Sequence, residues 1–281
     1  MLTSTFSVRS FNGYQKIFSY QSKELASTTR FGVYLPDGYE NSKLPVLFYL
    51  SGLTCTEMNF IEKSGFQRFA SKYKIIVVNP DTSPRGIDIE GDSDSYDFGK
   101  GAGFYVDATV DKWKKNYRMY SYVSKELVEV IKSNFNCNDN KFSIFGHSMG
   151  GHGALVIGLK NPFVFKSIST FSAICHPTLS PWGMKAFKGY LGEDIKSWKE
   201  YDATEIAKKY NGPLIKILLD QGSEDEFLIK KELLPEDFVN VKNDSIIVDY
   251  KLREGYNHSY YYIASVIEDH FAFHSSIFDN L

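Results

Sequence analysis

One pentapeptide of the chain has the residue types and spacing of a catalytic nucleophile. Residues 146–150 read Gly-His-Ser-Met-Gly and match the pattern Gly-x-Ser-x-Gly with Ser148 at its centre. So short a pattern also arises by chance, so the residues around it decide whether it marks a nucleophile. The apolar run Phe142–Phe145 before it predicts a strand, and a helical pattern begins near Met149. A strand, a sharp turn and a helix in this order expose a serine hydroxyl above a sheet, so we expect a nucleophile and not merely a glycine-rich turn.

A serine hydroxyl is a weak nucleophile at neutral pH and needs a base, for which histidine is the usual choice. The histidines that follow Ser148 are His152, His176, His258, His270 and His274. The first lies one turn into the predicted helix, and the last two, four residues apart, are expected on the surface of a C-terminal helix. His176 lies in a loop and is not excluded by position. His258 follows the predicted strand Ile246–Leu252, where this arrangement delivers its base, and is the predicted one.

The acidic partner of the histidine should follow the predicted strand Leu214–Leu219. Four carboxylates compete in that loop: Asp220, Glu224, Asp225 and Glu226. Asp220 ends the strand and could orient the loop, whereas Asp225 lies beyond the turn at Gly222 and can reach toward His258. Spacing favours Asp225 without excluding the others. Its role would be to hold the imidazole in the right tautomer and to stabilise the imidazolium.

Acyl transfer also needs backbone donors for the negative charge of the tetrahedral intermediate. One should be the N–H of Met149, directly after the nucleophile. The other should come from the loop Ser51–Thr56, which follows the predicted strand Pro45–Leu50. Gly52 permits a close turn there, so the N–H of Leu53 is the expected second donor.

These residues must be positioned by a sheet. Near-continuous apolar runs, typical of strands covered on both faces, occur at 45–50, 75–78, 142–145, 167–171, 214–219 and 246–250. Helical patterns lie between them: one capped by Ser121, one over 149–160 and one over 260–274. The early segments 6–9 and 30–35 suggest antiparallel strands at a sheet edge. We therefore expect an α/β fold, with a mostly parallel central sheet, helices on both faces and a single domain over residues 1–281.

The segment Asp81–Tyr117 interrupts this alternation. A stretch this long without predicted helices or strands is usually a functional loop, although a mobile surface excursion is the simpler interpretation. Its Gly-x-Gly-x-Gly run at 99–103 lacks the spacing of nucleotide fingerprints and follows no predicted strand, so we do not expect a phosphate site.

Composition excludes several classes of protein. Lys plus Arg minus Asp plus Glu is 32 − 34 = −2, so nothing draws the chain to nucleic acid or to an anionic membrane. No run of about 18 apolar residues predicts a membrane span, and the N-terminus lacks a secretory pattern. The three cysteines, Cys55, Cys137 and Cys175, are an odd number without the spacing of a zinc site. A reducing, cytoplasmic location is expected.

Four segments together carry a resemblance that runs nearly from end to end of the chain. They are Leu50–Glu57 (LSGLTCTE), Gly146–Ala154 (GHSMGGHGA), Asp220–Gly222 with Asp225 and Phe227–Leu228, and Glu254–Tyr261 (EGYNHSYY). In these segments the chain resembles the S-formylglutathione hydrolases, the esterase D family of α/β-hydrolases. The resemblance implies the triad Ser148, Asp225 and His258, hydrolysis of S-formylglutathione to glutathione and formate, activity on simple esters, no cofactor and no metal, and for many members a homodimer.

Alternatives remain at this stage. A general carboxylesterase or a feruloyl-type esterase would use the same residues, and a hydrolase fold kept as a binding module would not need them intact. Aromatic side chains that could wall a small acyl pocket are Phe104, Trp182 and Trp198, although aromatics are usually core. Cations that could bind glutathione carboxylates are Arg85, Lys100 and Lys112. Cys55, two residues after Leu53, is either a buried filler or a thiol whose modification blocks substrate.

Overall fold

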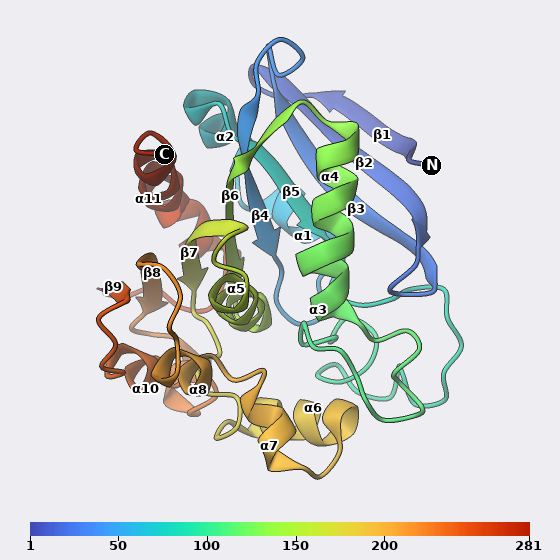
Figure 1. The fold of residues 1–281 in the computed structure, drawn as a ribbon, viewed down its shortest axis with the longest axis vertical. Helices are drawn as coiled ribbons and strands as arrows, with labels where there is room; N and C mark the ends of the chain where they lie inside the picture. The colour runs from blue at the N-terminus through green and yellow to red at the C-terminus, as the bar shows by residue number, and fades with distance from the viewer.

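The computed structural model describes residues 1–281 and contains one sheet of nine strands (Figure 1). The strands are β1 (Thr3–Arg9), β2 (Gly13–Ser22), β3 (Ser27–Pro36), β4 (Leu44–Leu50), β5 (Ile76–Pro80), β6 (Cys137–His147), β7 (Phe165–Phe171), β8 (Ile215–Gly222) and β9 (Ile246–Arg253). Their order across the sheet is β1-β2-β3-β5-β4-β6-β7-β8-β9. Strands β1, β2 and β3 and the β3–β5 pair are antiparallel, and every pairing from β5 to β9 is parallel.

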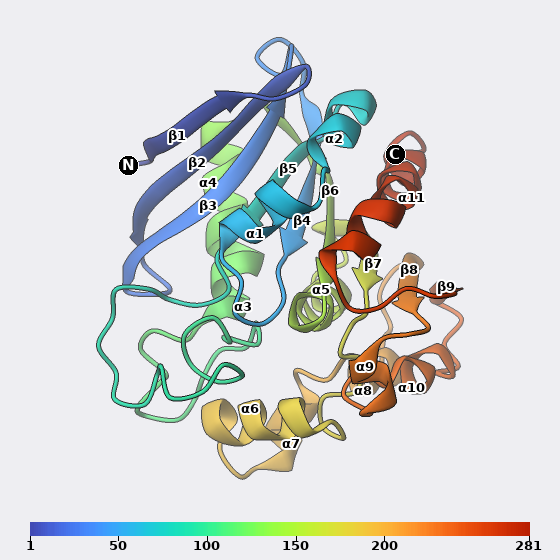
Figure 2. The same cartoon turned by 180° about the vertical axis from the view of Figure 1, so that it is seen from behind.

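Helices cover both faces of the sheet. They are α1 (Glu57–Lys63), α2 (Gln67–Tyr73), α3 (Met119–Ser121), the π-helical turn η1 (Tyr122–Leu127), α4 (Val128–Asn134), α5 (Met149–Lys160), α6 (Pro181–Leu191), α7 (Ile195–Lys199), α8 (Ala203–Lys208), α9 (Glu226–Ile229), α10 (Pro235–Val239) and α11 (Tyr260–Phe278). Helices α3, α4 and α5 lie in front of the sheet in Figure 1, whereas α1, α2 and α11 lie on the face seen in Figure 2.

Strand β4 shows why its sequence is almost entirely apolar. Successive side chains of a strand point to opposite faces. Val46, Phe48 and Leu50 belong to the core beneath α4 and α5, and Leu47 and Tyr49 belong to the core beneath α1, α2 and α11. Both faces are buried, so neither set can be polar. The expected α/β fold with a mostly parallel, doubly covered sheet is confirmed.

The structure corrects three local expectations. The edge hairpin contains a further strand, β2, which the sequence analysis missed because polar residues, Gln15 and Ser22, occupy buried positions and obscure the apolar alternation. Ser121 does not cap a helix from outside: the helix begins at Met119, and the Ser121 hydroxyl donates to Asp107. His270 and His274 are fully buried against the sheet and do not lie on the helix surface. Their partners, described below, are serines of β7.

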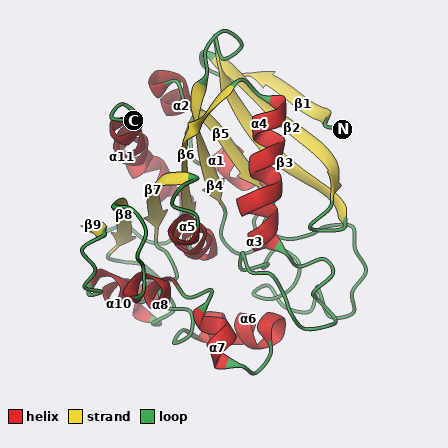
Figure 3. Cartoon of the chain, in the orientation of Figure 1, coloured by secondary structure: helices red, strands yellow, loops and turns green.

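The long segment between β5 and α3 forms no helix and only isolated bridges, yet it is packed (the green loop beside α6 in Figure 3). Its residues 104–106 are completely buried. The N–H of Gly99 donates to the hydroxyl of Tyr190 in α6, which in turn donates to the Ala102 carbonyl. The interpretation as a mobile surface excursion is therefore wrong for this part of the segment. Nowhere in the chain is there a helix with the length and apolarity to cross a membrane.

Candidate active site

Ser148 lies at the sharp turn between β6 and α5. Its φ of 58° and ψ of −120° place a non-glycine residue in the positive-φ region, which is strained and held only by its surroundings. The turn is tight: a Cβ on Gly146 would lie 2.2 Å from the Gly150 carbonyl oxygen, and one on Gly150 would lie 2.0 Å from that of Leu50. Only glycine fits at both positions. The structure thus places Ser148 where the sequence analysis expected it, at the carboxyl end of a central strand.

Asp225 and His258 meet above the neighbouring strands β8 and β9. His258 Nδ1 lies 2.7 Å from Asp225 Oδ2. The carboxyl group is fully buried, and the imidazole is 15% exposed. Burial raises the pKa of Asp225, but the hydrogen bond and charge of His258 outweigh it, so this pKa lies below its ordinary value. The pair is therefore arranged for a carboxylate that orients and stabilises an imidazolium.

The imidazole of His258 also packs against two rings. Its centroid lies 4.4 Å from that of His147 and 4.7 Å from that of Phe227. Burial and the nearby His258 hold the pKa of His147 well below its ordinary value, so this neighbour is neutral. Gln221 completes the surroundings, donating to Asp225 Oδ2 over 3.1 Å. Sequence reasoning assigned these three residues no role, although each lies in a segment that carries the family resemblance.

The loop after β4 lies against the nucleophile. A Cβ on Gly52 would be 3.1 Å from the Cβ of Ser148, so the glycine permits this close approach. Leu53 follows immediately and is half-buried. Met149 is the first residue of α5, where a helix leaves its amide without an intrahelical acceptor. The two expected backbone donors therefore lie on the two segments that enclose Ser148.

Side chains from the long segment 81–117 hold the Leu53 loop. The hydroxyl of Tyr105 donates to the Ser51 carbonyl over 2.9 Å, and the Gly101 carbonyl accepts from the Thr54 N–H over 2.9 Å. Thr82 and Arg85 both donate to the Cys55 carbonyl. Thr54 itself has a φ of 67°. The segment is thus a strap that fixes the shape of the loop beside Ser148.

The other carboxylates and histidines are engaged elsewhere. Asp220 lies within β8, and its side chain points to the α11 face, away from Asp225. Glu224 and Glu226 are exposed. His176 contacts Asp237 of α10 over 2.7 Å, and His152 contacts the Phe104 carbonyl over 2.9 Å.

The aromatic, cationic and cysteine candidates from the sequence differ in their surroundings. Trp182 packs at a tilt against Phe227, with centroids 4.5 Å apart, and Phe227 in turn contacts His258, whereas Trp198 packs on Phe187 in the α6–α7 region. Arg85 is paired with Asp81 over 2.8 Å, so its charge is already neutralised. Cys55 is buried, and burial raises the pKa of its thiol, which disfavours the reactive thiolate.

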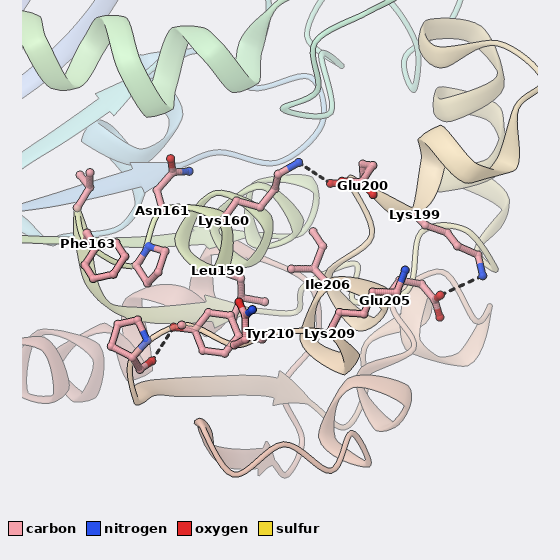
Figure 4. Close-up of a pocket in the computed structure, with 15 residues that line it drawn as sticks. Leu159, Lys160, Asn161, Phe163, Lys199, Glu200, Glu205, Ile206, Lys209 and Tyr210 are labelled. Carbon is pink, nitrogen blue, oxygen red and sulfur yellow. Dashed lines mark hydrogen bonds and ion pairs between the residues drawn. The ribbon is translucent and has the colours of Figure 1, made fainter.

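Cavities distinguish the site from the rest of the surface. A cavity of about 440 Å³ opens beside His258 and is lined by Glu224, Glu226, Phe227, Asn257, His258 and Ser259. A larger one, about 750 Å³, lies at the opposite end of α5 and is drawn in Figure 4. Its lining, from Leu159 to Val164 and from Lys209 to Pro213, includes no candidate catalytic residue. Of these two cavities, the smaller one is lined by a candidate catalytic residue, His258.

Comparisons with known proteins agree with this geometry. The Esterase family model matches residues 22–277. The S-formylglutathione hydrolase of Bos taurus is 54% identical over 275 residues, covering 98% of each chain, and that of Arabidopsis thaliana is 50% identical over 277 residues, covering 98% of this chain and 97% of the relative. The solved structure of an S-formylglutathione hydrolase from Agrobacterium tumefaciens is 42% identical and covers 98% of this chain and 99% of its own, with a TM-score of 0.94. With its strained serine turn and paired Asp225 and His258, this chain belongs to the S-formylglutathione hydrolase family of α/β-hydrolase esterases.

Proposed function

We propose that this protein hydrolyses S-formylglutathione to glutathione and formate, with Ser148 as nucleophile, His258 as base and Asp225 as the acid that orients it. The 2.7 Å contact between His258 Nδ1 and Asp225 Oδ2, beside a serine held at a strained turn, carries the proposal. The named relatives, at 50–54% identity over nearly the whole chain, support the choice of substrate.

The first half of the reaction transfers the formyl group to the enzyme. Because Nδ1 of His258 is engaged by Asp225, Nε2 is the nitrogen that accepts the Ser148 proton as the hydroxyl oxygen attacks the formyl carbon. The N–H groups of Leu53 and Met149 donate to the oxyanion that develops. Collapse of the tetrahedral intermediate breaks the carbon–sulfur bond, and the imidazolium returns its proton to the glutathione sulfur.

The second half releases formate. Water attacks the formyl ester of Ser148, with His258 again taking the proton, and the same two amides stabilise the second oxyanion. The carbon–oxygen bond to Ser148 breaks, and the serine hydroxyl is restored. No step requires a metal ion or a redox cofactor.

The substrate proposal is tested by comparing kcat/KM for S-formylglutathione with kcat/KM for short aryl esters, such as acetate and ferulate esters. We expect the thioester to be preferred by at least about tenfold, because binding of the glutathione portion contributes to the transition state. Equal or better hydrolysis of the esters would make the protein a general carboxylesterase with the same triad.

The proposal also includes the organisation of the enzyme. The site takes residues from Leu53 to His258, so we infer that residues 1–281 act as one domain. Three free, buried cysteines support a reducing, cytoplasmic location. Exposed Phe163, Leu214 and Leu281 line one surface groove and support a homodimer, which light scattering of the purified protein would test.

A further inference from the structure

We propose that Asp220, which does not touch the substrate, positions the catalytic histidine by holding both ends of the segment that carries it. This inference rests on the proposed role of His258. Asp220 lies within β8, five residues before Asp225, and its carboxyl group is almost completely buried. Its partners come from either side of His258 in the sequence.

The first partner precedes His258. Arg253, the last residue of β9, donates through Nε to Asp220 Oδ2 over 2.8 Å, and its NH2 group lies 2.6 Å from the same oxygen. This end of the segment is additionally joined to the β8–α9 loop: the Ser223 N–H donates to the Arg253 carbonyl, and the Glu224 N–H to the Tyr256 carbonyl, each over 2.9 Å. The chain is therefore well fixed as far as Tyr256.

The second partner follows His258. Tyr262, in the first turn of α11, donates its hydroxyl to Asp220 Oδ1. Between Tyr256 and Tyr262, Asn257 and Tyr261 are exposed and the other residues are partly buried, with the Tyr260 hydroxyl 3.5 Å from that of Tyr49. Tyr262 is the first residue after His258 whose side chain binds a buried carboxylate.

The buried carboxylate of Asp220 therefore fixes the positions of both ends of the loop that carries His258. His258 has to keep its Nδ1 on Asp225 while its Nε2 faces Ser148, and errors of about 1 Å in such geometry cost large factors in rate. Burial raises the pKa of Asp220, but the nearby His270 and the hydrogen bonds from Arg253 and Tyr262 outweigh it, so this pKa lies below its ordinary value and the anchor is ionised. We therefore treat Asp220 and Tyr262 as positioning residues.

The test compares two variants that cut the same buried network on different sides. Tyr262→Phe removes only the hydroxyl that anchors α11 to Asp220 and keeps the ring packed near Phe171 and Tyr256. The matched control, Ser169→Ala, removes a buried hydroxyl that contacts His270 and His274 and leaves the contacts of Asp220 with Arg253 and Tyr262 in place. Active sites are titrated with a fluorophosphonate, so that misfolded molecules do not count. Then kcat and KM are measured with S-formylglutathione and with an acetate ester.

We expect kcat per titrated site to fall about tenfold or more in Tyr262→Phe with KM for S-formylglutathione unchanged, and to stay within about twofold of the wild type in Ser169→Ala. Asp220→Asn should lower kcat further; if it does not fold, the tyrosine variant decides alone. Unchanged kcat in Tyr262→Phe, or an equal fall in both variants, would overturn the proposal. A wild type active only on the ester would contradict the proposed substrate instead, while the ratio of kcat values on the ester would still test the positioning.

Discussion

The chain contains two assemblies of serine, histidine and aspartate, and only one has the form of a catalytic site. In the first, His258 Nδ1 lies 2.7 Å from Asp225 Oδ2, and the His258 ring lies 4.4 Å from that of His147, the residue before Ser148. In the second, on the α11 face of the sheet, His270 Nδ1 lies 2.8 Å from the Ser169 hydroxyl and Nε2 lies 3.8 Å from Asp220. The two assemblies have the same residue types, but they differ in the backbone conformation of the serine and in the exposure of the histidine.

Three differences make the second assembly structural. His270 is completely buried, whereas the side chain of His258 is 15% exposed and lines a surface cavity that substrate can enter. Ser169 lies in β7 between β6 and β8, where backbone amides are used in the sheet and none is left for an oxyanion. Ser148, in contrast, lies at a strained turn next to the first amides of a helix. Location at the carboxyl edge of the sheet, more than the three residue types, distinguishes a site from a core network.

The comparison is tested most strongly by removing each serine hydroxyl in turn. Ser148→Ala should lower kcat/KM for S-formylglutathione by at least about 10³-fold with unfolding unchanged, because the nucleophile is lost. Ser169→Ala should leave kcat near that of the wild type. Activity is measured by thioester hydrolysis and folding by circular dichroism. Substantial turnover in Ser148→Ala would refute its assignment as nucleophile.

The second test replaces the aspartate in each of two aspartate–histidine pairs, Asp225 with His258 and Asp237 with His176. Asp225→Asn should lower kcat by about 10³-fold, because the amide no longer stabilises the imidazolium of His258 or fixes its tautomer. The matched control is Asp237→Asn, since Asp237 contacts His176 at the same 2.7 Å distance but outside the proposed site. Steady-state kinetics of the two variants should diverge sharply; similar kcat values would remove Asp225 from the triad.

Much of the arrangement around Ser148 and His258 was predictable, because it depends on local sequence. The turn at Ser148 requires glycine at positions 146 and 150, and a late loop carries His258, so motif and order were sufficient for a prediction. The placement of β4, β6 and β8 followed from apolar runs, since strands buried on both faces tolerate few polar residues.

What could not be predicted depends on contacts between distant segments. His270 and His274 have the spacing of an exposed helical pair, and only the serines of β7 opposite them explain their burial. The strap, segment 81–117, has no periodic sequence pattern. It is held in place by hydrogen bonds between the Leu53 loop and Tyr105, Gly101 and Arg85. Its length alone predicted a functional loop.

A third test measures what the structural assembly contributes to stability. Ser169→Ala leaves His270 Nδ1 and His274 Nε2 without the hydroxyl that each contacts at 2.8 Å. We expect the free energy of unfolding to fall by about 2–4 kcal/mol, because buried polar atoms lose their partner. Urea unfolding checks this, with Ser276→Ala on the exposed side of α11 as a control expected within about 0.5 kcal/mol of the wild type. Equal stability of the two variants would contradict a structural role for Ser169.

The smallest predicted effect is on the pH dependence of stability. Burial lowers the pKa of His152 to about 4, below the ordinary histidine value of 6.5, and burial also lowers the pKa values of His147, His270 and His274. A histidine that stays neutral when folded contributes stability above pH 6.5, and this contribution is lost as the pH falls toward 4, because the unfolded chain binds the proton first. His152→Gln keeps a donor for the Phe104 carbonyl but does not titrate. Its free energy of unfolding, followed in urea between pH 6.5 and 4, should decline less steeply than that of the wild type by up to ~1.4 kcal/mol per pH unit. Identical slopes would mean that His152 titrates equally in the folded and unfolded chains. Burial would then not keep this histidine neutral, and the contrast between neutral, structural histidines and His258 would fail.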